Sequence, residues 1–103
     1  ADYANAHTYF ANGGAPSITI DRLNAAAQLA ANDRPVIVTE MGWYTSGNVN
    51  DPTSVSDTVQ AKYMLAALLD AYESGTVKTY LYELLDRGVN STETEHNFGL
   101  FHG

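Results

Sequence analysis

The pattern of apolar and polar positions changes along the chain from a period of two to a helical period and back. Residues 1–10 alternate, which predicts a short strand, and the glycines and proline that follow predict a loop. Apolar and alanine positions fall at helical spacing from Ile18 to Asn32, which predicts an amphipathic helix. Pro35 then precedes an unbroken run from Val36 to Thr39, which is typical of a parallel strand covered on both faces.

The second half of the chain repeats this order. Residues 45–57 are polar and predict a long loop of the kind that often carries function. A second helix is predicted from about Asp57 to Glu73, with Ser54 and Ser56 as candidate caps. The run from Val77 to Leu85 is rich in aromatic and branched residues and predicts a third strand.

Strand, helix, strand, helix, strand is the βαβαβ order of a parallel sheet, so the predicted fold class is α/β. Right-handed crossovers place both helices on one face of the sheet if the strand order is sequential. The other face is then bare, and a closed (β/α)₈ barrel covers such a face by turning it inward. Three strands would supply only part of such a barrel.

Composition narrows the classes of function. A chain of 103 residues with 45% hydrophobic residues and no apolar run near 18 residues is expected to be one soluble, globular domain at most, without a membrane span. The net charge of -7 repels phosphate backbones and anionic lipid, so neither nucleic acid nor a membrane is an expected partner. Absence of cysteine excludes disulfides, thiolate zinc sites and a cysteine nucleophile.

Glu40 is the candidate for chemistry, because it follows the apolar run of the second predicted strand. Parallel barrels carry their active sites at the carboxyl ends of the strands, where His7, Glu40 and Glu83 all lie in this reading. A lone glutamate there is about as often a helix cap or a solvated charge. Trp43 and Tyr44 beside it favour a sugar site, since aromatic faces stack on sugars while a carboxylate acts on the anomeric carbon.

These residues carry a family resemblance. The segment PVIVTEMGWYTS resembles the seventh strand of clan A retaining glycoside hydrolases, cellulase-like (β/α)₈ enzymes in which the glutamate of TE-x-G is the nucleophile. NAHTY is similar to their sixth-strand H-x-Y, and YLYELLDRG with EHNFGLF is similar to the eighth strand and the following loop. The resemblance spans nearly the whole chain and implies that residues 1–103 are the C-terminal portion of a TIM barrel, strands six to eight, as one partial domain.

By this resemblance Glu40 is the nucleophile of a retaining glycoside hydrolase that acts on O-glycosidic bonds of a β-linked polysaccharide or oligosaccharide. His7 and Tyr9 would line the sugar-binding cleft, with Tyr9 as a hydrogen-bond donor that helps keep Glu40 ionised. Without Glu40 nearby, His7 and Tyr9 would read as a satisfied polar pair at a strand end.

The aromatic residues are further candidates for substrate binding. Of Trp43 and Tyr44, one is expected to be a sugar platform and the other to pack under the loop. On the last strand the family usually has an aromatic platform, often tryptophan, whereas this sequence has Tyr82 and then Glu83. No motif indicates a cofactor or a metal. The three histidines, His7, His96 and His102, lack the paired spacing of helical metal ligands.

Retaining hydrolysis also needs a second carboxyl group about 5 to 5.5 Å from the nucleophile. In this clan it comes from an N-E motif on the fourth strand, and the sequence has no such dipeptide. We therefore expect that this piece does not hydrolyse glycosides alone. The sequence starts without a Met or a basic, apolar signal region, which is expected of a mature product or a fragment. The expected partners of this piece are a carbohydrate substrate and either the missing N-terminal part of the barrel or another copy of the chain. An extracellular or periplasmic location is favoured, as family members are often secreted.

Two other classes of function fit the same residues. A non-catalytic module could use His7, Trp43, Tyr44 and Tyr82 as a sugar-binding surface. Alternatively, open strand edges and a bare apolar face are typical of a self-associating scaffold fragment. A nucleophile-elbow sequence is absent, so a serine hydrolase is not indicated.

Overall fold

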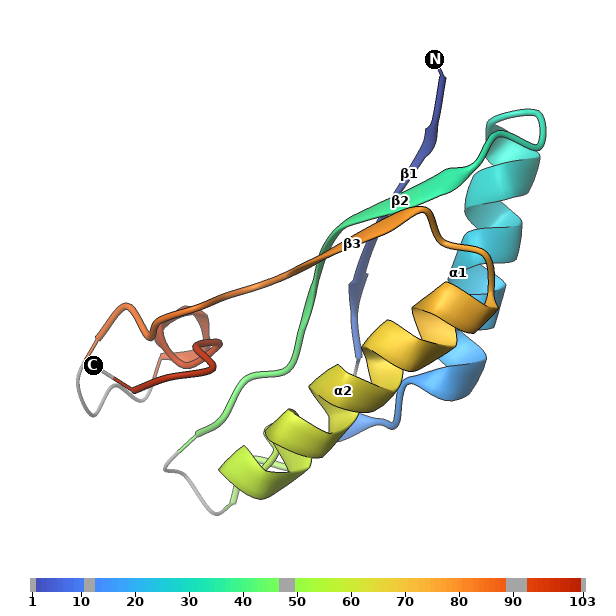
Figure 1. Cartoon of the computed structure of the whole chain (residues 1–103). Coiled ribbons are helices and arrows are strands. Elements are labelled where there is room, and N and C mark those ends of the chain that lie inside the picture. The colour runs from blue at the N-terminus through green and yellow to red at the C-terminus, as the bar shows by residue number, and fades with distance from the viewer. Residues whose placement is uncertain (1, 11–12, 47–49, 89–92, 103) are drawn as a thin grey trace.

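The computed structural model describes residues 2–10, 13–46, 50–88 and 93–102. Three parallel strands form one sheet in the order β1-β2-β3, and two long helices connect them (Figure 1). The predicted parallel βαβαβ unit is confirmed. The elements are β1 (Ala4–Tyr9), α1 (Ser17–Ala30), β2 (Val36–Gly42), α2 (Asp57–Glu73), β3 (Lys78–Leu81) and the short 3₁₀ helix η2 (Thr94–His96).

Both helices cover the same face of the sheet. Helix α1 packs against β1, β2 and α2, and α2 packs against β3 (Figure 1). Along β1, Ala4, Ala6 and Thr8 are buried while the residues between them are exposed. The core therefore lies between helices and sheet, as right-handed crossovers in sequential order require.

The core is built from small residues on β1 and larger ones on β2 and the helices. Ile20 on α1 and Met41 on β2 are the largest of its fully buried side chains, at 1% and 0% exposed. Asn24 of α1 donates to the hydroxyl of Thr76 at 2.8 Å, a buried link between α1 and the segment before β3. The main cluster consists of Ala4, Ala6, Phe10, Ile20, Val36, Val38, Met41, Trp43, Met64, Ala67 and Ala71.

The helix bounds agree closely with the expected ones. Helix α2 has the predicted ends, and Ser56 caps it by accepting a hydrogen bond from the backbone N–H of Val59 at 3.3 Å. Ser54 is not the cap, since its hydroxyl donates to the Asp51 carbonyl oxygen. Helix α1 ends at Ala30, before Asn32, because Asn32 has a φ of 53° in the left-handed region that ends a helix.

Strand β2 is longer than predicted, so Glu40 lies inside it and not beyond its end. Val36 and Val38 face the helices, and regular alternation would place Glu40 in the core beside them. The register is shifted instead, because Ala6 pairs with Val38 and the next residue of β1, His7, pairs with Glu40.

The residue left without a partner in this register, Thr39, makes a β-bulge. The bulge moves Met41 into the core position and turns Glu40 to the opposite side. We call that side the open face, defined by Asn5, His7 and Tyr9 of β1 with Thr39 and Glu40 of β2.

Strand β3 is shorter than predicted and ends at Leu81, so Tyr82 and Glu83 follow it. The backbone N–H of Tyr82 donates to the Met41 carbonyl at 2.8 Å, and the Tyr82–Glu83 peptide bond is cis. A Cβ atom on Gly42 would stand 2.1 Å from the Tyr82 carbonyl oxygen, which explains the glycine two residues after Glu40. Within the described residues, no helix has the length and apolar character needed to cross a membrane.

Candidate active site

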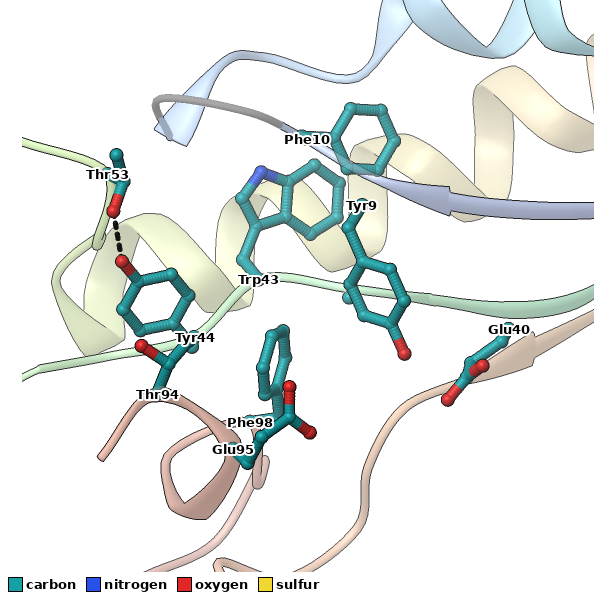
Figure 2. A pocket seen from close by; sticks show the side chains of 10 residues that line it. Tyr9, Phe10, Glu40, Trp43, Tyr44, Thr53, Thr94, Glu95 and Phe98 are labelled. Atoms are coloured by element: carbon teal, nitrogen blue, oxygen red, sulfur yellow. Dashed lines mark hydrogen bonds between the residues drawn. The ribbon is translucent and has the colours of Figure 1, made fainter. Parts of the chain in front are cut away.

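The carboxylate of Glu40 is held on the open face by two residues of β1. The imidazole Nδ1 of His7 lies 3.0 Å from Glu40 Oε2, and 28% of the Glu40 side chain is exposed. The Tyr9 hydroxyl points toward the same carboxylate (Figure 2). The pKa of Tyr9 is raised above its usual range, first by burial and then by Glu40, so this hydroxyl stays protonated and can donate.

A cavity of about 600 Å³ opens beside Glu40 at the carboxyl end of the sheet (Figure 2). Aromatic rings supply most of its wall, and carboxylates and hydroxyls supply its oxygen atoms. Such a mixture suits a sugar, which presents apolar C–H faces and hydroxyl edges. The lining residues are Tyr9, Phe10, Glu40, Gly42, Trp43, Tyr44, Thr53, Thr94, Glu95 and Phe98.

Phe98 is the centre of the aromatic wall and is itself only 6% exposed. Its ring centroid lies 5.2 Å from that of Tyr9 and 5.5 Å from those of Tyr44 and Tyr82. Buried Gln60 of α2 donates to the Trp43 carbonyl at 2.9 Å, with the carbonyls of the Phe98–Gly99 segment also within reach. This side chain therefore ties the end of β2 to the segment after η2.

Trp43 belongs to the core as well as to the cavity wall. The side chain is 2% exposed, stacks on Phe10 at 4.0 Å with an interplanar angle of 3°, and donates its Nε1–H to the Gly14 carbonyl at 2.9 Å. Little of its indole can meet a ligand, because Phe10 covers one face and Tyr63 packs nearby at 5.5 Å.

Tyr44 connects the cavity to the loop before α2. Its hydroxyl bonds to Asp51 Oδ2 at 2.9 Å and to the hydroxyl of Thr53. Hydrogen bonds from Thr53, and next from Tyr44, lower the pKa of Asp51, so this carboxylate is ionised at neutral pH and holds the loop against the wall.

Tyr82 and Glu83 lie beside the cavity and do not line it. Tyr82 packs edge-on against Tyr9, with centroids 6.2 Å apart, and the Arg87 guanidinium lies 5.2 Å from its ring centroid. Glu83 Oε2 accepts from Arg87 Nε at 3.1 Å, so this carboxylate is directed to Arg87. The structure thus brings Tyr9, Glu40, Trp43 and Tyr44 around one cavity, whereas His7 contacts Glu40 without lining the cavity, and Tyr82 and Glu83 lie beside it.

Six of the ten lining residues were not among the candidates from the sequence: Phe10, Gly42, Thr53, Thr94, Glu95 and Phe98. Glu95 and Phe98 reach the cavity from η2 and the segment after it, beyond the carboxyl end of β3 (Figure 1). The segment EHNFGLF resembles a loop of the family as a whole, but its residues follow no period, so the sequence does not indicate which side chains turn inward.

The histidines are dispersed. His7 pairs with Glu40, whereas His102 lies between Asp86 and Asp57. Across residues 2–10, 13–46, 50–88 and 93–102, no three side chains of metal-ligating type gather closely enough to hold a metal ion.

His102 links the C-terminal segment to the start of α2. Nδ1 lies 2.5 Å from Asp86 Oδ2, and Nε2 lies 3.3 Å from Asp57 Oδ2. The other oxygen of Asp86 accepts the backbone N–H of Gly99 at 2.8 Å. Asp86, and next Asp57, raise the pKa of His102, because both stabilise its charged form.

This link predicts a pH-dependent stability. The pKa of His102 in the folded protein lies above its unfolded value of about 6.5. The stabilisation by His102 is therefore complete below about pH 6.5 and is lost as the pH rises through the folded pKa. We expect the difference in unfolding free energy between wild type and His102→Gln to be largest below about pH 6 and to shrink as the pH rises above it. Urea unfolding at several pH values measures it, with Lys62→Gln as control. A difference that grows with pH would contradict the assignment.

Comparison with known proteins places this geometry in context. No family model matches the sequence. The chain is 33% identical over 86 residues to glucan endo-1,3-beta-glucosidase 2 of Arabidopsis thaliana, an alignment that covers 75% of this chain and 17% of the plant protein.

The solved structures agree in fold. A glycoside hydrolase family 17 β-1,3-glucanosyltransferase from Rhizomucor miehei superposes on 98% of the chain with a TM-score of 0.77 and 17% identity. A β-D-glucuronidase from Dictyoglomus thermophilum does so with a TM-score of 0.67 and 14% identity. The chain covers 39% and 19% of these two proteins. It therefore has the fold of part of a glycoside hydrolase (β/α)₈ barrel, as the resemblance implied.

Proposed function

We propose that this chain, which has the fold of part of a glycoside hydrolase barrel, carries the nucleophile of a retaining glycoside hydrolase, and that the nucleophile is Glu40. One observation carries the proposal. The bulge in β2 turns the Glu40 carboxylate out of the core, His7 holds it at 3.0 Å, and it borders an aromatic cavity of about 600 Å³.

In the proposed reaction a carboxylate oxygen of Glu40 attacks the anomeric carbon while a second carboxylic acid protonates the leaving oxygen. Water then releases the covalent glycosyl intermediate with retained configuration. His7 and Tyr9 hold the Glu40 carboxylate in place, and Tyr9 donates to this carboxylate as a protonated hydroxyl. We assign the second carboxylic acid to a part of the barrel outside these 103 residues.

The substrate we propose is a neutral β-linked glucan, with β-1,3-glucan as the first to test. Two similar proteins are named for β-1,3-glucan chemistry. The cavity supports a neutral sugar, because its described lining contains the carboxylates of Glu40 and Glu95 and no lysine or arginine. A uronic acid would bring a third negative charge without a cation to meet it.

The open face also supports a partner for this chain. In the described sheet β1 and β3 each pair along one edge only, and Tyr3, Tyr9 and Tyr80 are between 42% and 50% exposed. Unpaired edges and exposed rings of this kind need covering. We propose that the remaining strands of the barrel cover them, either in the same protein or from another copy. Because a polymeric glucan is the substrate, we place the activity outside the cytoplasm, in an extracellular or periplasmic setting.

The test is hydrolysis of β-1,3-glucan by the intact protein, by which we mean these 103 residues together with the remaining strands of the proposed barrel. The anomer of the new reducing end is followed by NMR. We expect the β-anomer first, and no turnover by the isolated 103-residue chain. First release of the α-anomer would contradict Glu40 as a nucleophile. Glucan binding without turnover by the intact protein would favour a carbohydrate-binding module, and hydrolysis of a β-glucuronide in preference would contradict the neutral substrate.

A further inference from the structure

The bulged residue Thr39 is held by its side chain. Its hydroxyl accepts a hydrogen bond from Asn5 Nδ2 at 2.9 Å and lies 3.4 Å from the carbonyl oxygen of Ala6, to which it donates. Ala6 is the last residue of β1 before the register shifts. The Thr39 side chain therefore bonds across the two strands at the point where the bulge forms.

Three successive open-face residues of β1 therefore interact with two successive residues of β2. Asn5 donates a hydrogen bond to Thr39, and the next open-face residue, His7, pairs with Glu40. Tyr9, the open-face residue after His7, points toward Glu40 (Figure 2). A regular strand would bring only alternate residues of β2 to this face. Thr39 and Glu40 can lie on it together because the bulge adds one residue.

We propose that Asn5 and Thr39 are positioning residues, whose hydrogen-bonded side chains hold the β2 bulge and so aim the Glu40 carboxylate at His7 and the cavity. Without the Thr39 hydroxyl, the competing arrangement is a regular β2 with Glu40 on the helix side and Met41 on the open face. That arrangement buries a carboxylate and exposes a large apolar side chain, so neither register would be fully favourable. The strand is then expected to exchange between the two registers.

The catalytic consequence rests on the proposed function, whereas the orientation of Glu40 does not. Displacement of a reacting group by about 1 Å can lower turnover by about 10²-fold. A shift of Glu40 away from His7 would therefore lower kcat and leave the aromatic wall, which binds the sugar, intact.

The experiment compares Thr39→Val, which removes the hydroxyl at nearly constant shape, with Thr39→Ser, which keeps it. In the intact protein, an NMR cross-peak between the His7 ring and the Glu40 side chain reports their contact. We expect Thr39→Val to lose this cross-peak and about 10²-fold in kcat, with KM changed less than about twofold. Thr39→Ser should keep both the cross-peak and the wild-type kcat.

Thr79→Val makes the same substitution on β3, at the register position of core-facing Val38, and should keep the cross-peak and kcat. Asn5→Leu removes the second member of the pair from an exposed position and carries the test if Thr39→Val does not fold. Loss of the cross-peak in Asn5→Leu supports the proposal.

A cross-peak that persists in Thr39→Val or in folded Asn5→Leu overturns the positioning role, whatever happens to kcat. A wild-type protein that shows the cross-peak but hydrolyses no glucan contradicts the proposed function. In that case the variants' cross-peaks alone still decide whether Asn5 and Thr39 aim Glu40.

Discussion

Replacement of Glu40 by glutamine is expected to lower kcat of the intact protein on β-1,3-glucan by roughly 10⁴- to 10⁶-fold, the range seen when single members of a serine hydrolase triad are removed. The amide has nearly the same shape but is a poor nucleophile, so the covalent intermediate cannot form at a useful rate. Binding of the glucan should change little, because the aromatic wall is unaltered.

Two controls make this result specific. Glu73→Gln makes the same change at the exposed end of α2 and should leave kcat within about twofold. The thermal midpoint of Glu40→Gln should stay close to that of wild type, since Glu40 is partly exposed. Turnover within tenfold of wild type in folded Glu40→Gln would remove Glu40 from the role of nucleophile.

Truncation of Trp43 to alanine is expected to have the largest effect on stability, about 3–5 kcal/mol of unfolding free energy. The indole is 2% exposed, stacks on Phe10 and donates to the Gly14 carbonyl, so its loss leaves a cavity and an acceptor without its donor. Urea unfolding of the intact protein measures the loss.

Tyr72→Ala is the matched control, because Tyr72 is an aromatic residue of α2, away from the open face, that is 82% exposed. It should cost less than about 1 kcal/mol. If Trp43→Ala lost less than about 1 kcal/mol and mainly raised KM, the indole would be a sugar platform and not a core residue. The two readings of Trp43 from the sequence are thus separated by one comparison.

Several features of the molecule follow from the sequence alone. The apolar run from Val36 and the helical spacing between Asp57 and Glu73 have periods that local backbone geometry imposes, so the parallel βαβαβ order and the bounds of α2 were predictable. The segment TE-x-G marked Glu40 as the candidate carboxylate, and H-x-Y marked the two side chains that turn out to face it.

The cavity-lining residues of the loops could not be predicted from the sequence. Glu95 and Phe98 lie in an irregular segment that is placed by Gln60 and by backbone bonds to Glu83, contacts between residues far apart in the chain. Nothing local indicates such contacts, so the wall of the cavity could not be listed from the sequence.

The sequence by itself determined the element order, the fold class and Glu40 as the candidate carboxylate, because these depend on residue types and on periods along the chain, whereas the role of nucleophile is what the family resemblance implies. Only the tertiary structure decided which way Glu40 points. By alternation it belongs with Val36 and Val38 in the core, and it reaches the open face only because β2 gains a residue against β1 at Thr39. A bulge arises from pairing between two strands, so neither strand alone could reveal it.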